Sequence, residues 1–324
     1  MRHLDYTVFI VRMSNIVEKE RKMNMEFVDA HAHIYERLTG FGPHGEARAI
    51  GGGMVEWATG RTERFLKAEH GEYGFSYDML ATLMEEGDIS HAVLLQGSNY
   101  GFQNSYTAEA VRMYPDKFTG AGTFDPYAKN ADKIFDNLVN NLGFKILKFE
   151  MSDGYGLVGY HPDLTLDDKV FEPYLRAAED MNITVVIDTG ELENKSCNVD
   201  SIVNVAQRHK KLNMVLAHTF FPRKDQKNDY RLELVKQLKG DNIFFDVAGY
   251  LRPSCAPENF SYFKKVINIV GSDHVAWGTD CPGAFMLYSY RELVEYICNM
   301  CGFTDTELTN LMAKTARYVY KIAD

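Results

Sequence analysis

Short runs rich in β-branched residues alternate with longer helical patterns along this chain, and this alternation constrains the fold more than any other feature. Eight such runs can be counted, at residues 26–31, 89–96, 118–124, 144–150, 183–188, 212–218, 242–248 and 274–280. Strands that alternate with helices are typical of repeated βα units built around a parallel sheet. Eight units of this kind close into a (β/α)8 barrel, the TIM barrel, so we predict an α/β fold of that type. Its active site would lie at the carboxyl ends of the strands.

The same pattern bears on domain organisation. At roughly 150 residues per domain the 324 residues would make two domains, but barrels of this kind reach that length as one unit. No Pro- or Ser-rich linker interrupts the pattern, and we therefore predict a single barrel domain over residues 25–324. Residues 1–24 precede the first strong pattern and are predicted to be an N-terminal appendage, either the product of an upstream start codon or a segment docked on the outside.

The chain ends in a helical pattern that follows the eighth unit. Thr304 is placed as the N-cap of this helix, and Glu307 would complete a capping box three residues later. We expect this C-terminal helix to pack on the outside of the barrel.

One connection is far longer than the others, because about residues 34–74 separate the first strand from the next helix. Loops after barrel strands usually have about 2–6 residues, and long loops without structure are usually functional. This one carries Gly51, Gly52 and Gly53, which could hinge a lid over the barrel mouth. The alternative is a disordered surface insertion. We favour the lid because a loop after the first strand would sit directly over the mouth.

The balance of charges disfavours two classes of partner. The chain has 35 Lys and Arg against 45 Asp and Glu, and its formal net charge of −10 repels nucleic-acid phosphates and anionic membrane surfaces. No run approaches the roughly 18 apolar residues of a membrane span. Five cysteines, an odd number, and no recognisable secretory signal favour reduced thiols and a cytoplasmic location. We therefore expect a small-molecule substrate, and neither nucleic acid nor a membrane, as the partner.

Residues suited to catalysis stand at three strand ends. His31 and His33 end the first run, and the period-two alternation of a strand sends both imidazoles to one side, where they can reach one metal ion. His218 ends the sixth run and Asp280 the eighth. Asp280 can ligate the metal or take a proton from an attacking water, and His218 can polarise a carbonyl or relay protons. Any one of them could be purely structural, but their coincidence at one rim favours an active site.

The segments around these residues resemble a known family. VDAHAH at the first strand, MVLAH at the sixth and AWGTDCP at the eighth are similar to the amidohydrolase superfamily, and more narrowly to its amidohydrolase-2 branch. Residues 103–126 and the closing helix resemble the same branch, so the likeness spans nearly everything after Met25. That branch contains aminocarboxymuconate semialdehyde decarboxylase, related aromatic-acid decarboxylases, and lactonases that open pyrone dicarboxylate or sugar lactones.

The resemblance implies a role for each residue. It assigns metal binding to His31 and His33, and substrate activation or proton transfer to His218. It assigns both metal binding and general-base work to Asp280. One position departs, because decarboxylases and most metal-bearing relatives have a His at the end of the fifth strand, where this chain has Asp188.

Because of Asp188, two interpretations of the metal site remain open. As a ligand it would complete a site of two His and two Asp for one divalent metal, with Zn²⁺ first and Mn²⁺ second. The alternative is a metal-free site, since the pyrone lactonase relatives also lack that His and resemble metal-independent enzymes.

Other polar residues near the strand ends are candidates for holding the substrate. Lys148 and Glu150 share one face of the fourth strand. Lys148 could hold a substrate carboxylate, bridge two metals as a carbamate, or pair with Glu150, which could also be an extra metal ligand. We favour the ion pair or the substrate contact, because the other ligands suggest one metal at most. The remaining candidates lie after the second strand, in the long loop, or after the seventh strand: Tyr100, Asn104, Arg61, Tyr250 and Arg252.

Together these features predict a hydrolase of the amidohydrolase type. Water activated by Asp280, with or without a metal on His31 and His33, would attack the carbonyl of a small, carboxylated substrate such as a lactone or amide. The alternative is a metal-dependent non-oxidative decarboxylase, a lyase in which His218 or Asp280 protonates the carbon that loses CO₂. Asp188 in place of His favours hydrolysis. A barrel that only binds a ligand is disfavoured because the catalytic set is intact, and the resemblance also allows a homodimer.

Overall fold

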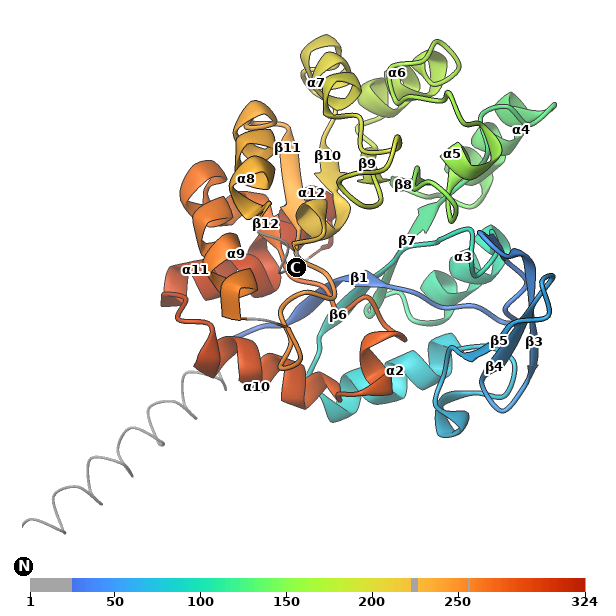
Figure 1. Cartoon of the computed structure of the whole chain (residues 1–324), viewed down its shortest axis with the longest axis horizontal. Coiled ribbons are helices and arrows are strands. Elements are labelled where there is room, and N and C mark those ends of the chain that lie inside the picture. The colour runs from blue at the N-terminus through green and yellow to red at the C-terminus, as the bar shows by residue number, and fades with distance from the viewer. Residues whose placement is uncertain (1–24, 223–226, 256, 324) are drawn as a thin grey trace, which may run out of the picture.

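Eight parallel strands form one sheet that curves into a barrel (Figure 1). The computed structural model describes residues 25–222, 227–255 and 257–323, so the predicted appendage at residues 1–24 lies outside the described residues. The strands neighbour one another in chain order: β1 (Val28–Ala32), β6 (His91–Leu94), β7 (Phe118–Gly122), β8 (Ile146–Glu150), β9 (Thr184–Asp188), β10 (Met214–Leu216), β11 (Ile243–Asp246) and β12 (Val275–Ala276). Each predicted run overlaps one of these strands, and the (β/α)8 barrel is confirmed.

Backbone hydrogen bonds close the barrel between β1 and the segment that follows β12. The N–H of Ala30 donates to the Trp277 carbonyl (2.9 Å), and the N–H of His33 donates to the Cys281 carbonyl (3.0 Å). Ala32 also pairs with Cys281 in a parallel bridge. This seam joins the histidine-bearing strand directly to the segment that carries Asp280.

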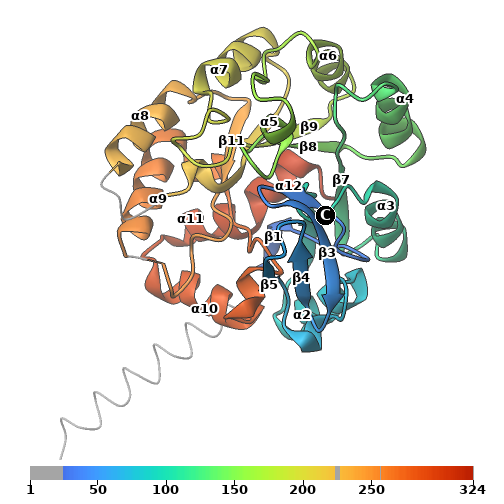
Figure 2. The ribbon, with the colours of Figure 1, turned by 45° about the vertical axis from the view of Figure 1, so that its right-hand side comes forward.

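Helices surround the barrel (Figure 2). The longer ones are α2 (Tyr77–Glu86), α3 (Asn104–Met113), α4 (Ala131–Asp136), α6 (Glu172–Asp180), α7 (Val199–Arg208), α8 (Asn228–Gln237), α9 (Pro257–Val270) and α10 (Tyr290–Met300), and the short α5 (Leu157–Tyr160) follows β8. In α7, the Asn198 side chain caps the first turn by accepting the Ser201 N–H (3.0 Å). Ile202 and Val205 bury one face of α7 and Asp200 stays exposed, as an amphipathic helix requires. Within the described residues, no helix is both long enough and apolar enough to cross a bilayer.

The long connection after β1 is a small antiparallel sheet and not an irregular loop. Its strands are β2 (Phe41–Gly42), β3 (Gly45–Gly51), β4 (Met54–Trp57) and β5 (Thr62–Arg64). Alternate residues of β3 and β4, among them Ala49 and Val55, are buried, which gives the sheet an apolar face. The alternative of a disordered insertion is therefore wrong, whereas a lid role stays a prediction.

The three glycines of this segment form a hairpin turn. Residues 51–53 have φ values of 104°, 58° and 72°, which only glycine adopts freely, and they connect β3 to β4. Earlier in the same segment, the N–H of Phe41 donates to the Ser98 carbonyl (2.9 Å), so the small sheet is tied to the loop that follows β6. The sheet thus lies against the carboxyl end of a barrel strand.

The last helical segment closes the amino end of the barrel. It consists of α11 (Asp305–Thr309), the π-helical turn η6 (Asn310–Lys314) and α12 (Thr315–Tyr320), and the predicted capping box of Thr304 and Glu307 is present. Ala316 and Val319 pack in one cluster with Val28, Val93 and other residues of the barrel interior. The Thr184 hydroxyl, at the start of β9, donates to the Val319 carbonyl (2.5 Å).

The expectation that this helix packs on the outside of the barrel is wrong. The interior-facing residues of the strands are apolar, and at the amino end they need a cover that excludes water. An amphipathic pattern shows which face of a helix is buried, but it does not show which surface that face meets.

Gly278 lies at the tightest point of the barrel seam. A Cβ atom at this position would come within 2.6 Å of the His31 Cβ and 2.8 Å of the His31 backbone nitrogen. We expect Gly278→Ala to lower the free energy of unfolding by about 1–3 kcal/mol, measured by urea denaturation, because the two segments must separate. Gly240→Ala is the control, since its Cβ would meet only Asn242 Oδ1 at 3.5 Å. Equal stability of the two variants would contradict this account of the seam.

Candidate active site

A cavity of about 340 Å³ opens where the barrel strands end. Most of the predicted site residues line it: His33, Tyr100, Lys148, Glu150, Asp188, His218 and Asp280. They come from strands that are distant in sequence, and the barrel gathers their carboxyl ends at one rim. Ser152, Asp153 and Tyr155, from the loop after β8, add to the wall.

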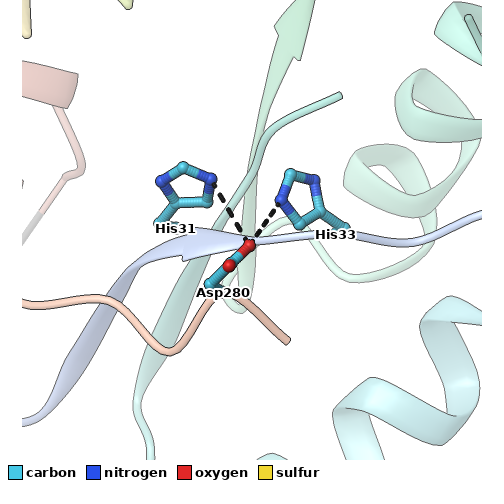
Figure 3. Close-up of side chains that lie close together, drawn as sticks. All are labelled: His31, His33 and Asp280. Carbon is cyan, nitrogen blue, oxygen red and sulfur yellow. Dashed lines mark hydrogen bonds and ion pairs between the residues drawn. The ribbon is translucent and has the colours of Figure 1, made fainter. Parts of the chain in front are cut away.

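His31, His33 and Asp280 converge at the barrel seam (Figure 3). One ligand atom from each residue lies within 4.8 Å of the others. The pairing of β1 with β6 shifts register between Asp29 and Ala32, and this irregularity precedes the point where His33 reaches the rim. Asp280 has a left-handed backbone (φ 59°), and its N–H donates to the His31 carbonyl (2.9 Å). Such conformations in residues other than glycine concentrate at functional sites.

The hydrogen bonds of the two imidazoles leave both Nε2 atoms facing Asp280. His33 Nδ1 donates to the Leu95 carbonyl (3.0 Å), and His33 Nε2 lies 3.2 Å from Asp280 Oδ1. Burial, which disfavours the charged form, lowers the pKa of His33 to about 4, so Nε2 carries a lone pair at neutral pH. His31 Nδ1 donates to a buried carboxylate, Asp246 (2.9 Å). His31 Nε2 lies 4.0 Å from Asp280 Oδ1 and has no hydrogen-bond partner among the described residues.

This donor set fits a divalent metal. Two imidazole Nε2 atoms and a carboxylate oxygen face one another, and in the neutral rings, whose Nδ1 atoms donate to other groups, neither Nε2 carries a proton to share. That arrangement is unfavourable by itself, and a cation would satisfy all three groups. His31, His33 and Asp280 are therefore the residues that could hold a metal.

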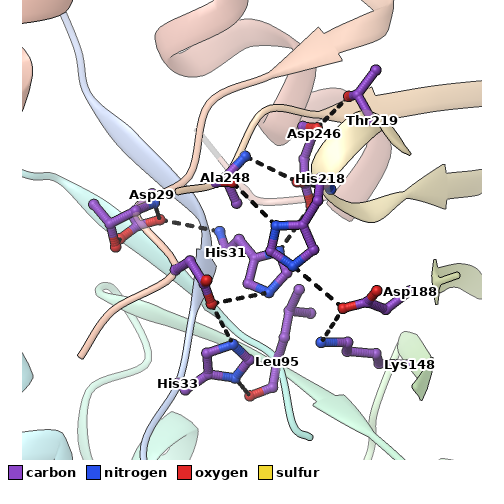
Figure 4. A network of polar contacts seen from close by, with 12 residues as sticks. Asp29, His31, His33, Leu95, Lys148, Asp188, His218, Thr219, Asp246 and Ala248 are labelled. Atoms are coloured by element: carbon purple, nitrogen blue, oxygen red, sulfur yellow. Dashed lines mark hydrogen bonds and ion pairs between the residues drawn. The ribbon is translucent and has the colours of Figure 1, made fainter. Parts of the chain in front are cut away.

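Asp188 lies beside His218 and Lys148, apart from the three-residue group (Figure 4). Its Oδ2 is 3.3 Å from His218 Nε2 and 3.9 Å from Lys148 Nζ. Burial alone would raise the pKa of Asp188, but the charges of His218 and Lys148 hold it below its usual range. Its role as a fourth metal ligand stays a prediction.

His218 faces hydrogen-bond acceptors at both ring nitrogens. Nδ1 donates to the Ala248 carbonyl (3.1 Å), and Nε2 faces the Asp188 carboxylate. Burial would lower the pKa of His218, but the charge and hydrogen bond of Asp188, helped by Asp280, raise it to about 10. At neutral pH the ring is therefore an imidazolium, with a proton on the nitrogen that faces the cavity.

Lys148 and Glu150 form a second charged pair on the cavity wall. Lys148 Nζ is 3.5 Å from Glu150 Oε2, and only 1% of the lysine side chain is exposed. Burial and the charge of Asp188 raise the pKa of Glu150 to about 7 even though Lys148 opposes the shift. Glu150 Oε1 accepts a hydrogen bond from the Ser152 hydroxyl (2.5 Å). Among the described residues that line the cavity, Lys148 is the one lysine or arginine.

Four predicted substrate contacts lie off the cavity wall in the described structure: Arg61, Asn104, Tyr250 and Arg252. Arg61 pairs with Glu63 (2.8 Å) within the small sheet. Asn104 Nδ2 donates to the Thr123 carbonyl (2.9 Å) at the start of α3. Tyr250 lies behind His218, with a ring centroid distance of 6.1 Å. Position along the chain placed these residues after the correct strands but could not give the direction of their side chains.

Two buried carboxylates, which were not predicted as site residues, hydrogen-bond to site residues or to the segments that carry them. Asp29 accepts hydrogen bonds from the Tyr290 hydroxyl (2.8 Å) and the Thr279 hydroxyl (2.6 Å), so it ties β1 to the segment that precedes Asp280. Asp246 accepts the His31 Nδ1 proton. The sequence could have indicated that both residues belong to the site, because each is an acidic residue inside an apolar run at a strand end.

Comparisons with known proteins identify the family and the fold of the chain. The amidohydrolase family model Amidohydro_2 matches residues 28–322. A probable 2-pyrone-4,6-dicarboxylic acid hydrolase from Acinetobacter baumannii, solved with citric acid bound, is 17% identical, covers 92% of this chain and 100% of its own, and superposes with a TM-score of 0.65. No curated protein sequence is significantly similar.

Two further solved structures have the same fold. An amidohydrolase from Burkholderia multivorans with bound zinc is 15% identical, with 92% of this chain and 100% of that one covered and a TM-score of 0.64. 5-Carboxyvanillate decarboxylase from Sphingomonas paucimobilis is 16% identical, with coverage of 75% and 82% and a TM-score of 0.53. Because the family model spans nearly the whole of the described barrel, the chain belongs to the amidohydrolase family.

Proposed function

We propose that this protein hydrolyses an acyl C–O or C–N bond, such as that of a lactone or amide, in a small substrate. The observation that carries the proposal is the presence of a base and an acid on one cavity. Asp280 is a carboxylate whose pKa is held low by the neighbouring His33 and by the charge of His218, although burial alone would raise it. His218 presents a protonated nitrogen to the same cavity. Hydrolysis needs both groups, one to take a proton from water and one to protonate the oxygen or nitrogen that leaves.

Each residue has a defined task in this proposal. Asp280 would accept the proton of the attacking water. His218 would donate its Nε2 proton to the carbonyl oxygen or the leaving group, and Asp188 would hold the ring in place through the 3.3 Å contact. Because His218 is buried, these charge interactions are stronger than they would be in water.

His31, His33 and Asp280 would hold a divalent metal, and we propose zinc as the ion. Such a metal supplies Lewis-acid chemistry, because it polarises a carbonyl and lowers the pKa of water towards about 7. Zinc bound to the Burkholderia multivorans amidohydrolase supports this choice. His31 contributes the buried Nε2 that otherwise has no partner among the described residues.

We propose that the substrate carries a single carboxylate. Among the described residues of the cavity wall, Lys148 is the lysine or arginine placed to meet it, and its Nζ already lies 3.5 Å from Glu150 and 3.9 Å from Asp188. The two arginines expected to help, Arg61 and Arg252, do not line the cavity in the described structure. Names such as 2-pyrone-4,6-dicarboxylic acid hydrolase among similar structures support a carboxylated lactone. The crowded charges around Lys148 argue for fewer carboxylates than such a dicarboxylate bears.

The metal proposal predicts a stoichiometry. After exposure to zinc and removal of excess ion, elemental analysis should find about one zinc per chain, and His33→Ala should lose most of it because one of three ligand atoms is gone. His161→Ala is the matched control, since His161 pairs with Asp125 (2.9 Å) outside the cavity wall. Asp188→Ala should keep its zinc if three residues suffice. A zinc content that is the same in His33→Ala as in the wild type would contradict the site.

The proposed reaction is tested by a substrate panel. Purified, zinc-loaded protein is given lactones and amides with zero, one or two carboxylates, and aromatic carboxylic acids of similar size. Acid release from the lactones is followed with a pH indicator, amine or ammonia release from the amides with an amine reagent, and CO₂ release separately. We expect acid release from lactones with one carboxylate. Release of CO₂ from the aromatic acids, without lactone opening, would instead favour the decarboxylase alternative.

A further inference from the structure

Asp246, the last residue of β11, contacts both His31 and the segment that carries His218 (Figure 4). Its side chain is fully buried. Oδ2 accepts the hydrogen bond of His31 Nδ1 (2.9 Å), and Oδ1 accepts the backbone N–H groups of His218 (2.8 Å) and Ala248 (3.1 Å). One carboxylate therefore contacts a proposed metal ligand and the segment that carries the proposed proton donor.

The segment that carries His218 has an uncommon backbone. Residues 218–221 have consecutive φ values of 60°, 46°, 63° and 50°, and none of them is glycine. Left-handed conformations of such residues persist only where the surrounding structure holds them. Asp246 holds this turn at two points, since the His218 N–H donates to its carboxylate and the Thr219 hydroxyl donates to its backbone carbonyl (2.5 Å).

The contact with His31 also decides which ring nitrogen carries the proton. A carboxylate oxygen can only accept, so Nδ1 of His31 is the protonated nitrogen. In the neutral imidazole, Nε2 then has a free lone pair, and it faces Asp280 Oδ1 at 4.0 Å. Histidines that bind metals usually donate their other ring N–H to a carboxylate or carbonyl in this way, which fixes both the tautomer and the ring orientation.

We infer that Asp246 is a positioning residue whose carboxylate sets the His31 tautomer and anchors the left-handed turn of His218. It touches neither the proposed substrate cavity nor the reacting atoms. The inference rests on the proposed function only for the catalytic importance of His31 and His218. The tautomer and the turn geometry are properties of the chain without substrate.

The variant that tests this inference most directly is Asp246→Asn, which keeps the size and shape of the side chain. The asparagine carbonyl can still accept the two backbone N–H groups, so its NH₂ group would face His31 Nδ1. That nitrogen must then accept, and the proton moves to Nε2, where it blocks metal binding. We expect the zinc affinity, measured by competition with a chromophoric chelator, to fall about 10–100-fold.

The tautomer itself is read by nitrogen-detected NMR of the histidine rings in the metal-free protein. The His31 signals are assigned by their loss in His31→Gln. The wild type should carry the proton on Nδ1 and Asp246→Asn on Nε2. Thr219→Val is the matched control, because it removes the hydroxyl contact to the Asp246 backbone but leaves the carboxylate contacts intact. It should keep the wild-type tautomer and a zinc affinity within about threefold of wild type.

Three results would overturn the inference. They are a wild-type His31 protonated on Nε2, an Asp246→Asn variant with wild-type tautomer and zinc affinity, or an equal loss of affinity in Thr219→Val. If Asp246→Asn does not fold, the wild-type spectrum and the Thr219→Val affinity decide the matter. Neither readout uses a substrate, so a wrong reaction assignment would fail in the substrate panel and leave these measurements unchanged.

Discussion

Asp280→Asn should lower kcat by about 10²–10⁴-fold, the range that a general base contributes. Asparagine keeps the shape of the side chain, but its amide cannot accept the proton of an attacking water. The same change removes the charged oxygen that lies 3.2 Å from His33 Nε2, so zinc affinity should fall as well. The fold should survive, because 39% of the Asp280 side chain is exposed to the cavity. The change in kcat is measured by steady-state kinetics on the best substrate of the panel. Circular dichroism checks that the variant is folded.

The control for Asp280→Asn is Asp273→Asn. Asp273 is 72% exposed and lies in the short helix that precedes β12, away from the cavity wall. The Asp273→Asn substitution removes one negative charge from the same region of the sequence. It should leave kcat within about twofold of wild type, since a surface substitution of this kind has little effect. An Asp280→Asn variant that keeps more than about a tenth of wild-type kcat would fall outside the contribution of a general base and would contradict the proposed mechanism.

His218→Gln should also lower kcat by about 10²–10⁴-fold, with a smaller effect on zinc content than Asp280→Asn. The glutamine amide can still hydrogen-bond to Asp188, but it has no proton to give to a leaving group. His218 is not part of the three-residue metal group, so the loss should appear chiefly in kcat. This separation of activity from metal binding distinguishes a proton donor from a ligand.

His161→Gln serves as the matched histidine control. Its ring pairs with Asp125 (2.9 Å), is 28% exposed, and does not line the cavity. If His218→Gln turned over as fast as His161→Gln, proton donation would have to come from elsewhere. If it lost its zinc together with its activity, His218 would be acting as a ligand and the division of roles would be wrong.

The barrel could be predicted because its signals are local and repeated. Each strand is a short β-branched run, and once eight are counted the barrel places the ends of all of them at one rim. That geometry is why His33, Asp188, His218 and Asp280 could be expected together before any contact was known. The small sheet of residues 41–64 was missed because its strands are short and its sequence is rich in glycine and charge.

The pairing of side chains within the site could not be predicted. Whether Asp188 faces a metal ion or His218 depends on rotamers and on differences of about an ångström, which no spacing rule contains. Asp246 was not predicted as a site residue for the same reason. Its proposed role depends on contacts with His31 and with the backbone of His218, and neither residue is near it in sequence. Lys148 and Glu150 pair across two positions of one strand, a local relation that period-two alternation does reveal.

The central claim is that the protein uses water to cleave an acyl C–O or C–N bond of its substrate. The most direct measurement is mass spectrometry of the product formed in ¹⁸O-enriched water, with the most active substrate of the panel and a no-protein blank for spontaneous hydrolysis. Our account predicts a product that keeps all its carbon and gains one ¹⁸O in a new carboxyl group. A product that has lost CO₂ and carries no ¹⁸O would contradict hydrolysis and assign this amidohydrolase to the lyases.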